Sequence, residues 1–417
     1  MINLREPERA FLLGIESTRR DSWPIERSLA ELEALAQTAG ATVVGSAFQR
    51  RQAPDPLWYV GKGRAADLAL EKGEVNFNVL IVDDELRPGQ QRNLEKLLDC
   101  KVIDRSALII DIFARHAKTK EGRLQVELAA LEYHLPRLTR MWTHLSRTGG
   151  GIGTRGPGES QLETDRRLIR EKIKKIRKEL DAVKRQRATA ARARESSEVA
   201  QVALVGYTNA GKSTLLNALA DAHIYAADML FATLDPTSRQ VVLPSGQQIV
   251  ITDTVGFINK LPHDLVDAFR ATLEEVLRAD VLLEVVDAAN PDFIAQQETV
   301  QNVLYELGAG DKPRITVFNK IDLLDATSRA DSVPASPLAA YVSSRTGEGL
   351  DELRQRIASI LEASMAEIDV LIPYNRAELV VKARLRGGVE ESYEEEGIRL
   401  RGRLPQGIAA ELGLVSL

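Results

Sequence analysis

The nine residues "GYTNAGKST" (206–214) constrain the fold of this 417-residue chain more than any other stretch. They fit the pattern G-x-x-x-x-G-K-[ST], and they stand between the apolar run "QVALV" and the helical pattern "TLLNALAD". The order strand, glycine-rich loop, helix is that of a phosphate-binding loop, whose backbone N–H groups meet phosphates at a helix N-terminus. We therefore predict a doubly wound α/β domain that binds a nucleotide.

The residue types inside this loop predict how the phosphates and a metal are held. Lys212 is expected to reach the β- and γ-phosphates, and the Ser213 hydroxyl is expected to ligate Mg²⁺. Asn209 is a candidate ligand for a monovalent cation such as K⁺, with a simple turn residue as the equal alternative. The predicted nucleotide contacts of the loop are Gly206, Asn209, Ala210, Gly211, Lys212, Ser213 and Thr214.

Two later motifs narrow the nucleotide to GTP. "DTVG" (253–256) follows an apolar run, so Asp253 is expected at a strand end, holding Mg²⁺ through water. The backbone N–H of Gly256 is expected to approach the γ-phosphate. "NKID" (319–322) follows "RITVF", and the Asp322 carboxylate can accept both the N1 and N2 hydrogens of guanine, a pair that adenine lacks.

A third motif, "SSRTGEG" (343–349), completes the predicted base site. Lys320 is expected to stack along the base, and the Ser344 backbone is expected near guanine O6. The predicted contacts on the guanine side are Asn319, Lys320, Asp322, Ser343, Ser344 and Arg345. In this order and spacing, the four motifs together are specific for a GTPase.

Hydrolysis requires a positioned water, and the sequence gives only part of that machinery. We assign catalytic roles to Lys212, Thr233 and Gly256, with Thr233 as the switch residue that meets Mg²⁺ and the γ-phosphate. Thr237 is a weaker candidate for the same role. Many GTPases place a glutamine after the "DxxG" glycine, but this chain has Phe257, which cannot hydrogen-bond a water. The intrinsic rate is therefore slow, or catalysis is completed by another group, a monovalent cation or a partner.

The hydrophobic pattern predicts four segments. Residues 1–120 alternate buried-strand runs with helical patterns, which indicates an N-terminal α/β domain with a parallel sheet. Residues 121–198 read as a helical hairpin and linker, 199–365 as the GTP-binding domain, and 366–417 as a small α+β domain. The N-terminal strands are expected at 11–17, 42–48, 78–84 and 100–105, with a helix over 24–40.

The hairpin is predicted from two apolar stripes with coiled-coil spacing. Arg166 is the one polar member of the second stripe, and residues 186–198 read as a polar linker. Ser160 and Glu163 fit a capping box, so the second helix is expected to begin there. The stripes consist of Leu124, Leu128, Leu131, Leu135 and Leu138, then Leu162, Ile169, Ile173, Ile176, Leu180 and Val183.

Charge is segregated toward this hairpin. Residues 137–194 hold 17 basic and 6 acidic residues, although the whole chain has a net charge of −5. A polyanion such as RNA is the favoured partner, and a solvated helix face is the alternative. Arg137 and Arg140 at the base of the hairpin are further candidates for neutralising phosphates. The predicted RNA contacts at the tip are Arg147, Gly149, Gly150, Gly151, Gly153, Arg155, Gly156 and Gly158.

Composition excludes several other classes of protein. Apolar runs are too short to span a bilayer, and the N-terminus has no signal-peptide pattern. The single Cys100 excludes an intrachain disulfide and a cysteine-based zinc site, which suits a reducing cytoplasm. We expect a cytoplasmic monomer.

Beyond the GTPase motifs, three stretches resemble the HflX family of translational GTPases: "VGKGRAADL" (60–68), residues 102–138 and "GGGIGTRGPGESQLETDRRLIREKI" (149–173). The resemblance implies an N-terminal α/β domain with a helical hairpin, a GTPase domain and Mg²⁺. It also implies binding to the large ribosomal subunit, with the glycine-rich tip near the peptidyl-transferase RNA. Ribosome-stimulated hydrolysis and the splitting or rescue of stalled ribosomes under stress are the implied activity.

Two other functions remain open from the residues alone: a GTPase that assembles immature subunits, and a non-catalytic GTP-dependent adaptor for proteins. ATP use by the N-terminal domain has also been proposed for the family. Residues 1–120 contain no phosphate-loop signature, and "VGKG" (60–63) reads as a turn between a strand and a helix.

Overall fold

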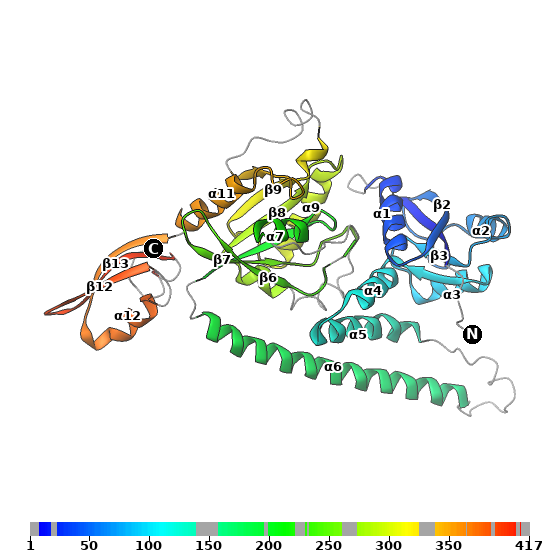
Figure 1. The fold of residues 1–417 in the computed structure, drawn as a ribbon. Helices are drawn as coiled ribbons and strands as arrows, with labels where there is room; N and C mark the ends of the chain where they lie inside the picture. The colour runs from blue at the N-terminus through cyan, green and yellow to red at the C-terminus, as the bar shows by residue number, and fades with distance from the viewer. Residues whose placement is uncertain are drawn as a thin grey trace, which may run out of the picture. The chain divides into compact units, whose positions relative to one another are not determined.

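The computed structural model describes residues 8–17, 23–138, 157–195, 199–221, 230–231, 233–260, 273–324, 338–363, 365–384, 388–405 and 409. The chain divides into two compact units (Figure 1). The first unit takes in residues 1–181 together with two short later segments, 228–234 and 260–270. The second unit contains the remainder of the chain.

The first unit is built on a four-stranded parallel sheet in the order β2-β1-β3-β4. Its strands are β1 (Arg9–Ser17), β2 (Thr42–Arg51), β3 (Val79–Val82) and β4 (Lys101–Asp104), which confirms the four predicted runs. The central strand β3 is buried at all four positions, as expected for a parallel sheet covered on both faces.

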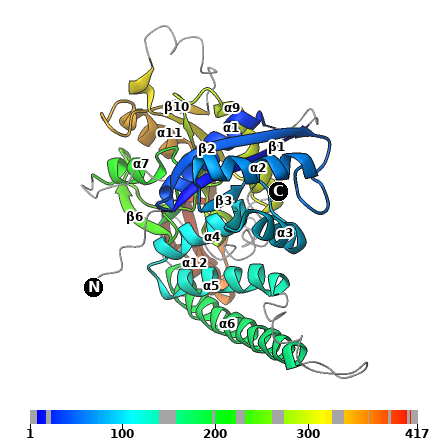
Figure 2. The ribbon, with the colours of Figure 1, turned by 90° about the vertical axis from the view of Figure 1, so that its right-hand side faces the viewer.

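Helices cover both faces of this sheet (Figure 2). Two helices, α1 (Ile25–Thr38) and α4 (Arg105–His116), pack together on one face. The opposite face is covered by α2 (Lys62–Val75) and α3 (Pro88–Leu98), whose apolar side chains join those of β1, β3 and β4 in one core. The "VGKG" stretch forms a loop that opens α2, with Gly61 at its N-cap. The predicted helix over 24–40 corresponds to α1.

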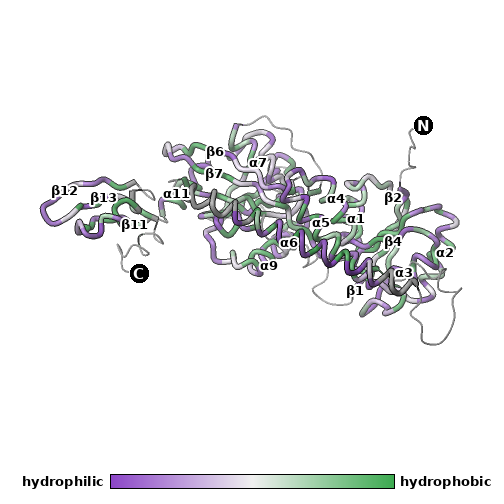
Figure 3. The backbone as a smooth tube through the Cα atoms, turned by 90° about the horizontal axis from the view of Figure 1, so that it is seen from below, coloured by the Kyte–Doolittle hydropathy of each residue, from purple (hydrophilic) through white to green (hydrophobic). Residues whose placement is uncertain are grey.

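A pair of antiparallel helices follows, α5 (Lys120–His134) and α6 (Pro157–Glu195) (Figures 1 and 2). Their seam joins Leu124, Leu128, Leu131 and Leu135 to Ile169, Ile173, Ile176 and Leu180. Green bands interrupt the hydrophilic purple along these helices (Figure 3). Arg166, the polar member of the stripe, donates to the Leu138 carbonyl at 3.0 Å, which explains its place at the seam.

Two predictions about α6 were wrong. The helix begins at Pro157 and not after a Ser160 capping box, because proline at the first helical position is pre-organised for a helix and needs no N–H partner. The expected polar linker is helical as far as Glu195. Alanine and arginine, which are abundant from 186 to 194, are among the strongest helix formers and extend the helix.

The second unit contains a six-stranded sheet in the order β10-β9-β8-β5-β7-β6. The five parallel strands are β5 (Ala200–Gly206), β7 (Gln248–Asp253), β8 (Val281–Asp287), β9 (Arg314–Asn319) and β10 (Ala339–Tyr341). The antiparallel edge strand β6 (Thr237–Val242) was not predicted. Its side chains alternate between partly buried and exposed, so it lacks the continuous apolar run that marks the other strands.

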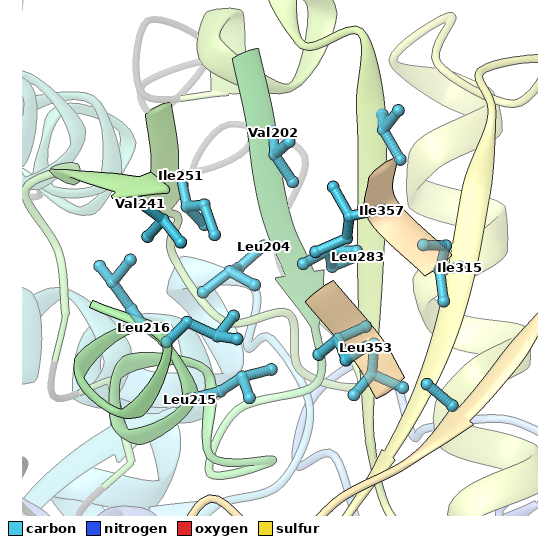
Figure 4. Close-up of a cluster of buried hydrophobic side chains, with 14 of the residues drawn as sticks. Val202, Leu204, Leu215, Leu216, Val241, Ile251, Leu283, Ile315, Leu353 and Ile357 are labelled. Atoms are coloured by element: carbon cyan, nitrogen blue, oxygen red, sulfur yellow. The ribbon is translucent and has the colours of Figure 1, made fainter. Parts of the chain in front are cut away.

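One face of this sheet packs against α7 (Lys212–Leu219) and α11 (Leu350–Ala363). Figure 4 shows Leu215 and Leu216 of α7 and Leu353 and Ile357 of α11 packing with side chains of the strands. A further helix, α9 (Phe293–Glu306), contacts β8 and β5 from the other face. The predicted doubly wound α/β fold is confirmed.

The chain ends in a small antiparallel sheet in the order β11-β13-β12. Its elements are β11 (Met365–Ile372), α12 (Ala377–Arg384), β12 (Gly388–Glu394) and β13 (Gly397–Pro405). Apolar residues of α12 complete its core. Among the described residues, no helix is long and apolar enough to cross a membrane. The division of the chain into four domains stays a prediction.

Candidate nucleotide-binding site

The phosphate loop joins β5 to α7, and two of its glycines are required by the backbone. Gly206 has φ +151°, and a Cβ there would lie 2.3 Å from the Val285 carbonyl oxygen. Gly211 has φ +93°, and a Cβ there would lie 2.3 Å from Asn319 Nδ2. No side chain fits either position, so the loop approaches β8 and the "NKID" motif more closely than other residues would allow.

Lys212 is held inside this loop. Its side chain is buried, and Nζ donates to the carbonyls of Gly206 at 3.1 Å and Tyr207 at 2.8 Å. Burial lowers the pKa of the Lys212 ammonium to about 8, and the Asp253 carboxylate opposes that shift. A phosphate beside this ammonium would compensate for the desolvation, so the geometry suits an anionic ligand.

The donor set beside Lys212 fits Mg²⁺. The Ser213 hydroxyl donates to Asp253 Oδ2 at 2.6 Å, so the two predicted magnesium residues lie in contact. Both supply hard oxygen atoms, which Mg²⁺ prefers, and Mg²⁺ in nucleotide sites takes few protein ligands besides phosphates and water.

The "DTVG" motif lies along the phosphate loop. Phe257 N donates to Gly206 O at 3.1 Å, and Thr208 N donates to Phe257 O at 2.7 Å. A Cβ on Gly256 would lie 2.7 Å from Thr208 Cα and 3.0 Å from Lys212 Nζ. Gly256 is therefore packed beside the lysine that is predicted to bind the γ-phosphate, and its own role stays a prediction.

On the guanine side, Asp322 is fixed as an acceptor. Its Oδ1 accepts a hydrogen bond from the Ser343 hydroxyl at 2.6 Å, and its Oδ2 pairs with Arg345 at 2.6 Å. The Ser343 hydrogen bond, followed by the charge of Arg345, lowers the pKa of Asp322 despite the opposing effect of burial. The carboxylate is therefore ionised at neutral pH, as reading guanine N1 and N2 requires.

Asn319 is buried and connects the base side to the phosphate side. Its Nδ2 donates to the Ala210 carbonyl at 3.0 Å, while Oδ1 accepts from Ser344 N at 3.0 Å and from Ser344 Oγ at 2.8 Å. Lys320 adopts φ 64° and pairs with Asp287 Oδ2 at 2.8 Å, and its stacking along the base stays a prediction. The structure thus brings the predicted phosphate and guanine residues of the second unit together.

Other predicted residues are placed elsewhere. Thr233 belongs to the first unit, so its role as a magnesium ligand stays a prediction. Thr237 begins β6, opposite Asp253. Asn209 is exposed with φ 60°, and Thr214 lies in the first turn of α7. The cation role of Asn209 stays a prediction.

Most of the predicted RNA contacts lie outside the described residues. These are Arg147, Gly149, Gly150, Gly151, Gly153, Arg155 and Gly156, together with Arg140 at the hairpin base. Gly158 is in the first turn of α6.

The prediction that Arg137 neutralises RNA phosphates is not supported. Its Nη2 pairs with Asp104 at 3.1 Å and donates to Leu86 O at 2.8 Å, and its guanidinium lies 3.5 Å from the centre of the Tyr133 ring. With a side chain only 10% exposed, Arg137 joins α5 to the sheet.

Sequence reasoning missed two residues that hold the site together. The Tyr207 hydroxyl accepts a hydrogen bond from Asn259 N at 2.7 Å, which ties the phosphate loop to the chain after "DTVG". The buried Thr254 hydroxyl donates to Leu204 O at 2.6 Å and fixes "DTVG" against β5. Both occupy variable positions of their motifs, so the motif patterns gave no signal for them.

Comparison with known proteins agrees with this geometry. Residues 26–114, 116–194 and 201–320 match the family models described as GTP-binding GTPase N-terminal, GTP-binding GTPase Middle Region and 50S ribosome-binding GTPase. GTPase HflX of Caldanaerobacter subterraneus is 46% identical over 401 residues, which cover 96% of this chain and 92% of the relative. This chain belongs to the HflX family. GTPase HflX of Escherichia coli is 44% identical over 402 residues, covering 95% and 94%.

Membership of the HflX family confirms the predicted resemblance and the GTPase activity. Among solved structures, the crystal structure of SsGBP in complex with GDP aligns with a TM-score of 0.47 and 24% identity. That alignment covers 85% of this chain and 99% of the other. The individual roles of the site residues remain proposals.

Proposed function

We propose that this HflX-family GTPase binds the large ribosomal subunit and couples GTP binding and hydrolysis to the splitting or rescue of stalled or idle ribosomes. Mg²⁺ is the proposed cofactor, with K⁺ as a candidate second cation at Asn209. The ribosome supplies the stimulation of hydrolysis that the chain's own residues leave incomplete. The description "50S ribosome-binding GTPase", matched by residues 201–320, supports this proposal.

The observation that carries the proposal is the charge of α6. Arg170, Lys174 and Lys178 follow one another at a spacing of four residues and form one exposed stripe. None of the three forms an ion pair with any acidic side chain in the described part of the chain. Lys172 and Arg177, in contrast, pair with Glu127 and Glu132 of α5. A cationic stripe without carboxylate partners fits the phosphate backbone of RNA.

The chain's own residues would act as follows. Lys212 neutralises charge on the β- and γ-phosphates, while Ser213 and Asp253 hold the metal that shields them. Gly256 offers its N–H to the γ-phosphate, and Asp322 selects guanine. Phe257 is buried with its backbone hydrogen-bonded to the phosphate loop, and its hydrocarbon side chain cannot orient the attacking water. This gap is consistent with a partner that completes catalysis.

Cosedimentation with purified large subunits tests the RNA interface. We expect binding with a GTP analogue, and a triple variant of Arg170, Lys174 and Lys178 to alanine should bind more weakly. Each lost phosphate contact should reduce the slope of log affinity against log salt by roughly 0.7 to 0.9, or about 2 to 3 for the triple variant. Alanine at the exposed cations Lys62, Arg92 and Lys96 is the matched control, since it removes equal charge from α2 and α3. Equal slopes for the two triple variants would contradict the proposed interface.

The GTPase rate with and without large subunits tests the activity. We expect stimulation in the wild type and its loss when residues 149–158 are deleted, with the subunit-free rate unchanged. Stimulation and subunit release that survive the deletion would contradict the role of the glycine-rich tip. Stronger binding to immature than to mature subunits would favour the assembly alternative, and absence of subunit binding would favour the adaptor.

A further inference from the structure

A buried tyrosine stands at a position of the phosphate loop that the motif leaves open. Tyr207 is the first variable residue of "GYTNAGKST", and its side chain is 4% exposed. Neither phosphate nor Mg²⁺ binding requires a phenol at this position, because backbone N–H groups, the lysine and the Ser/Thr hydroxyl supply those contacts. The contacts of the Tyr207 side chain therefore need an explanation of their own.

Tyr207 forms hydrogen bonds at both of its ends. Its carbonyl accepts a hydrogen bond from Lys212 Nζ at 2.8 Å. Its hydroxyl accepts a hydrogen bond from Asn259 N at 2.7 Å, three residues after Gly256. All four residues belong to the second unit of the chain. Tyr207 thus joins the lysine that is predicted to bind the γ-phosphate to the segment whose N–H is predicted to meet the same phosphate.

The segment that carries Gly256 is tied to β5 and the phosphate loop both before and after this glycine. Before it, the Thr254 hydroxyl donates to Leu204 O at 2.6 Å. After it, the backbone of Phe257 forms a parallel bridge with Tyr207. The hydrogen bond between the Tyr207 hydroxyl and the following backbone extends this second attachment by two residues.

The pairing of this segment with β5 contains one extra residue. Leu204 pairs with Asp253 in the ladder, and the bridge further along joins Tyr207 to Phe257. Between these pairs the β5 side advances by three residues and the facing side by four. An extra residue of this kind bends a strand and is common beside active sites. The stretch 254–256 that holds it ends at the glycine of "DTVG", so the position of this glycine depends on how firmly the pairing resumes after it.

We propose that Tyr207 is a positioning residue for GTP hydrolysis: its hydroxyl, bonded to Asn259 N, holds the segment that carries Gly256 against the phosphate loop. The hydroxyl acts through Gly256, whose N–H is predicted to stabilise charge on the γ-phosphate. The inference rests on the GTPase activity of the family and not on the proposed ribosomal function. Because every contact that supports it lies in the second unit, the effect should be present without ribosomes.

Single-turnover GTP hydrolysis by the full chain, without ribosomes, tests this role. Tyr207→Phe removes the hydroxyl and keeps the ring, so it should lower the hydrolysis rate roughly fivefold, which corresponds to about 1 kcal/mol, the net contribution of one hydrogen bond. The affinity for GDP should stay within about twofold of the wild type, because the loop glycines, Lys212 and the guanine side keep their contacts. Tyr305→Phe is the matched control, since it removes the hydroxyl of a tyrosine of α9 that is 81% exposed.

The pattern of effects distinguishes positioning from a purely structural role. The Tm of Tyr207→Phe should fall by no more than about 4 °C, the shift expected for one lost hydrogen bond in a domain of this size. The proposal is overturned if Tyr207→Phe hydrolyses GTP as fast as Tyr305→Phe, or if it fails to fold. Equal losses of GDP affinity and hydrolysis rate would also overturn it, since the tyrosine would then shape the whole nucleotide site. A faster rate would do the same, because the hydroxyl would then restrain Gly256.

Discussion

Replacing Asn319 by alanine should remove the hydrogen bonds that connect the base side of the nucleotide site to the phosphate side. The substitution removes three hydrogen bonds at once: one from Nδ2 to the Ala210 carbonyl, and two that Oδ1 accepts from Ser344. It also opens space below Gly211, whose backbone lies against the amide of Asn319. Asn319 is 2% exposed, so water cannot easily replace the lost partners.

The magnitude follows from the number of bonds lost. Each hydrogen bond contributes about 1 kcal/mol net, so the unfolding free energy of the GTP-binding domain should fall by about 3 kcal/mol. For a domain of this size, that loss lowers Tm by roughly 6 to 12 °C. Since both loops of the site shift, the affinities for GTP and GDP should fall together, by up to about two orders of magnitude.

Thermal unfolding and titration with fluorescent GTP and GDP analogues measure both effects. Ser344→Ala is the graded control, because it removes only the Oγ bond and leaves Ser344 N bonded to Asn319. It should cost about 1 kcal/mol, a third of the larger effect. If Asn319→Ala and Ser344→Ala shift Tm equally, the account based on three bonds is wrong. A selective loss of GTP over GDP would also refute it, since Asn319 is predicted to serve the base side.

Three further outcomes can be checked with the same material. Glu284 is buried, and burial raises the pKa of its carboxyl, although Arg314 at 3.7 Å and the side chains of Thr316 and Gln297 oppose this shift. Glu284→Gln should therefore stabilise the protein by about 1 kcal/mol at pH 7, a gain that denaturant unfolding should show shrinking as pH falls and the native carboxyl becomes protonated. The pKa of Asp83 is lowered from 3.8 to about 2, so its carboxylate should add about 2 kcal/mol to the free energy of unfolding above pH 4. This contribution should be lost between pH 4 and 2, and Asp83→Asn should flatten that part of the plot of unfolding free energy against pH. Arg345→Ala should raise the affinity for GDP by up to about threefold in nucleotide titrations, because the exposed Arg345 competes with guanine for the Asp322 carboxylate.

The elements that local sequence patterns determine were predicted well. Most of the nine parallel strands contain an apolar run that could be read directly, although the edge strand β2 has no buried residue. The phosphate-loop spacing placed Lys212 and Ser213 next to Asp253. The edge strand β6 was not predicted because its residues alternate between exposed and partly buried positions, a pattern without a continuous apolar run. The predicted start of α6 was wrong because the sequence contains two helix-start signals three residues apart, Pro157 and Ser160, and the helix begins at the first.

The contacts that could not be predicted join residues far apart in the sequence. Arg137 is separated from Asp104 by 33 residues and looked like part of a basic surface, yet it is buried on the carboxylate. Lys260 and Asp83 are 177 positions apart, and no periodicity or motif links them. Such pairs depend on which strand ends the topology brings together, and that information emerges only from the folded sheet.

The two parallel sheets of this chain show why topology alone does not assign a ligand. Each sheet presents the carboxyl ends of its strands at a point where the strand order reverses, the position at which doubly wound folds bind ligands. At the end of β5, glycine backbone N–H groups and Lys212 make the position attractive to phosphates. At the end of β3, Asp83 and Asp84 make the equivalent position attractive to cations, and Lys260 occupies it. The sign of the charge at the strand ends therefore distinguishes a position that suits a phosphate from one that cations of the chain itself occupy.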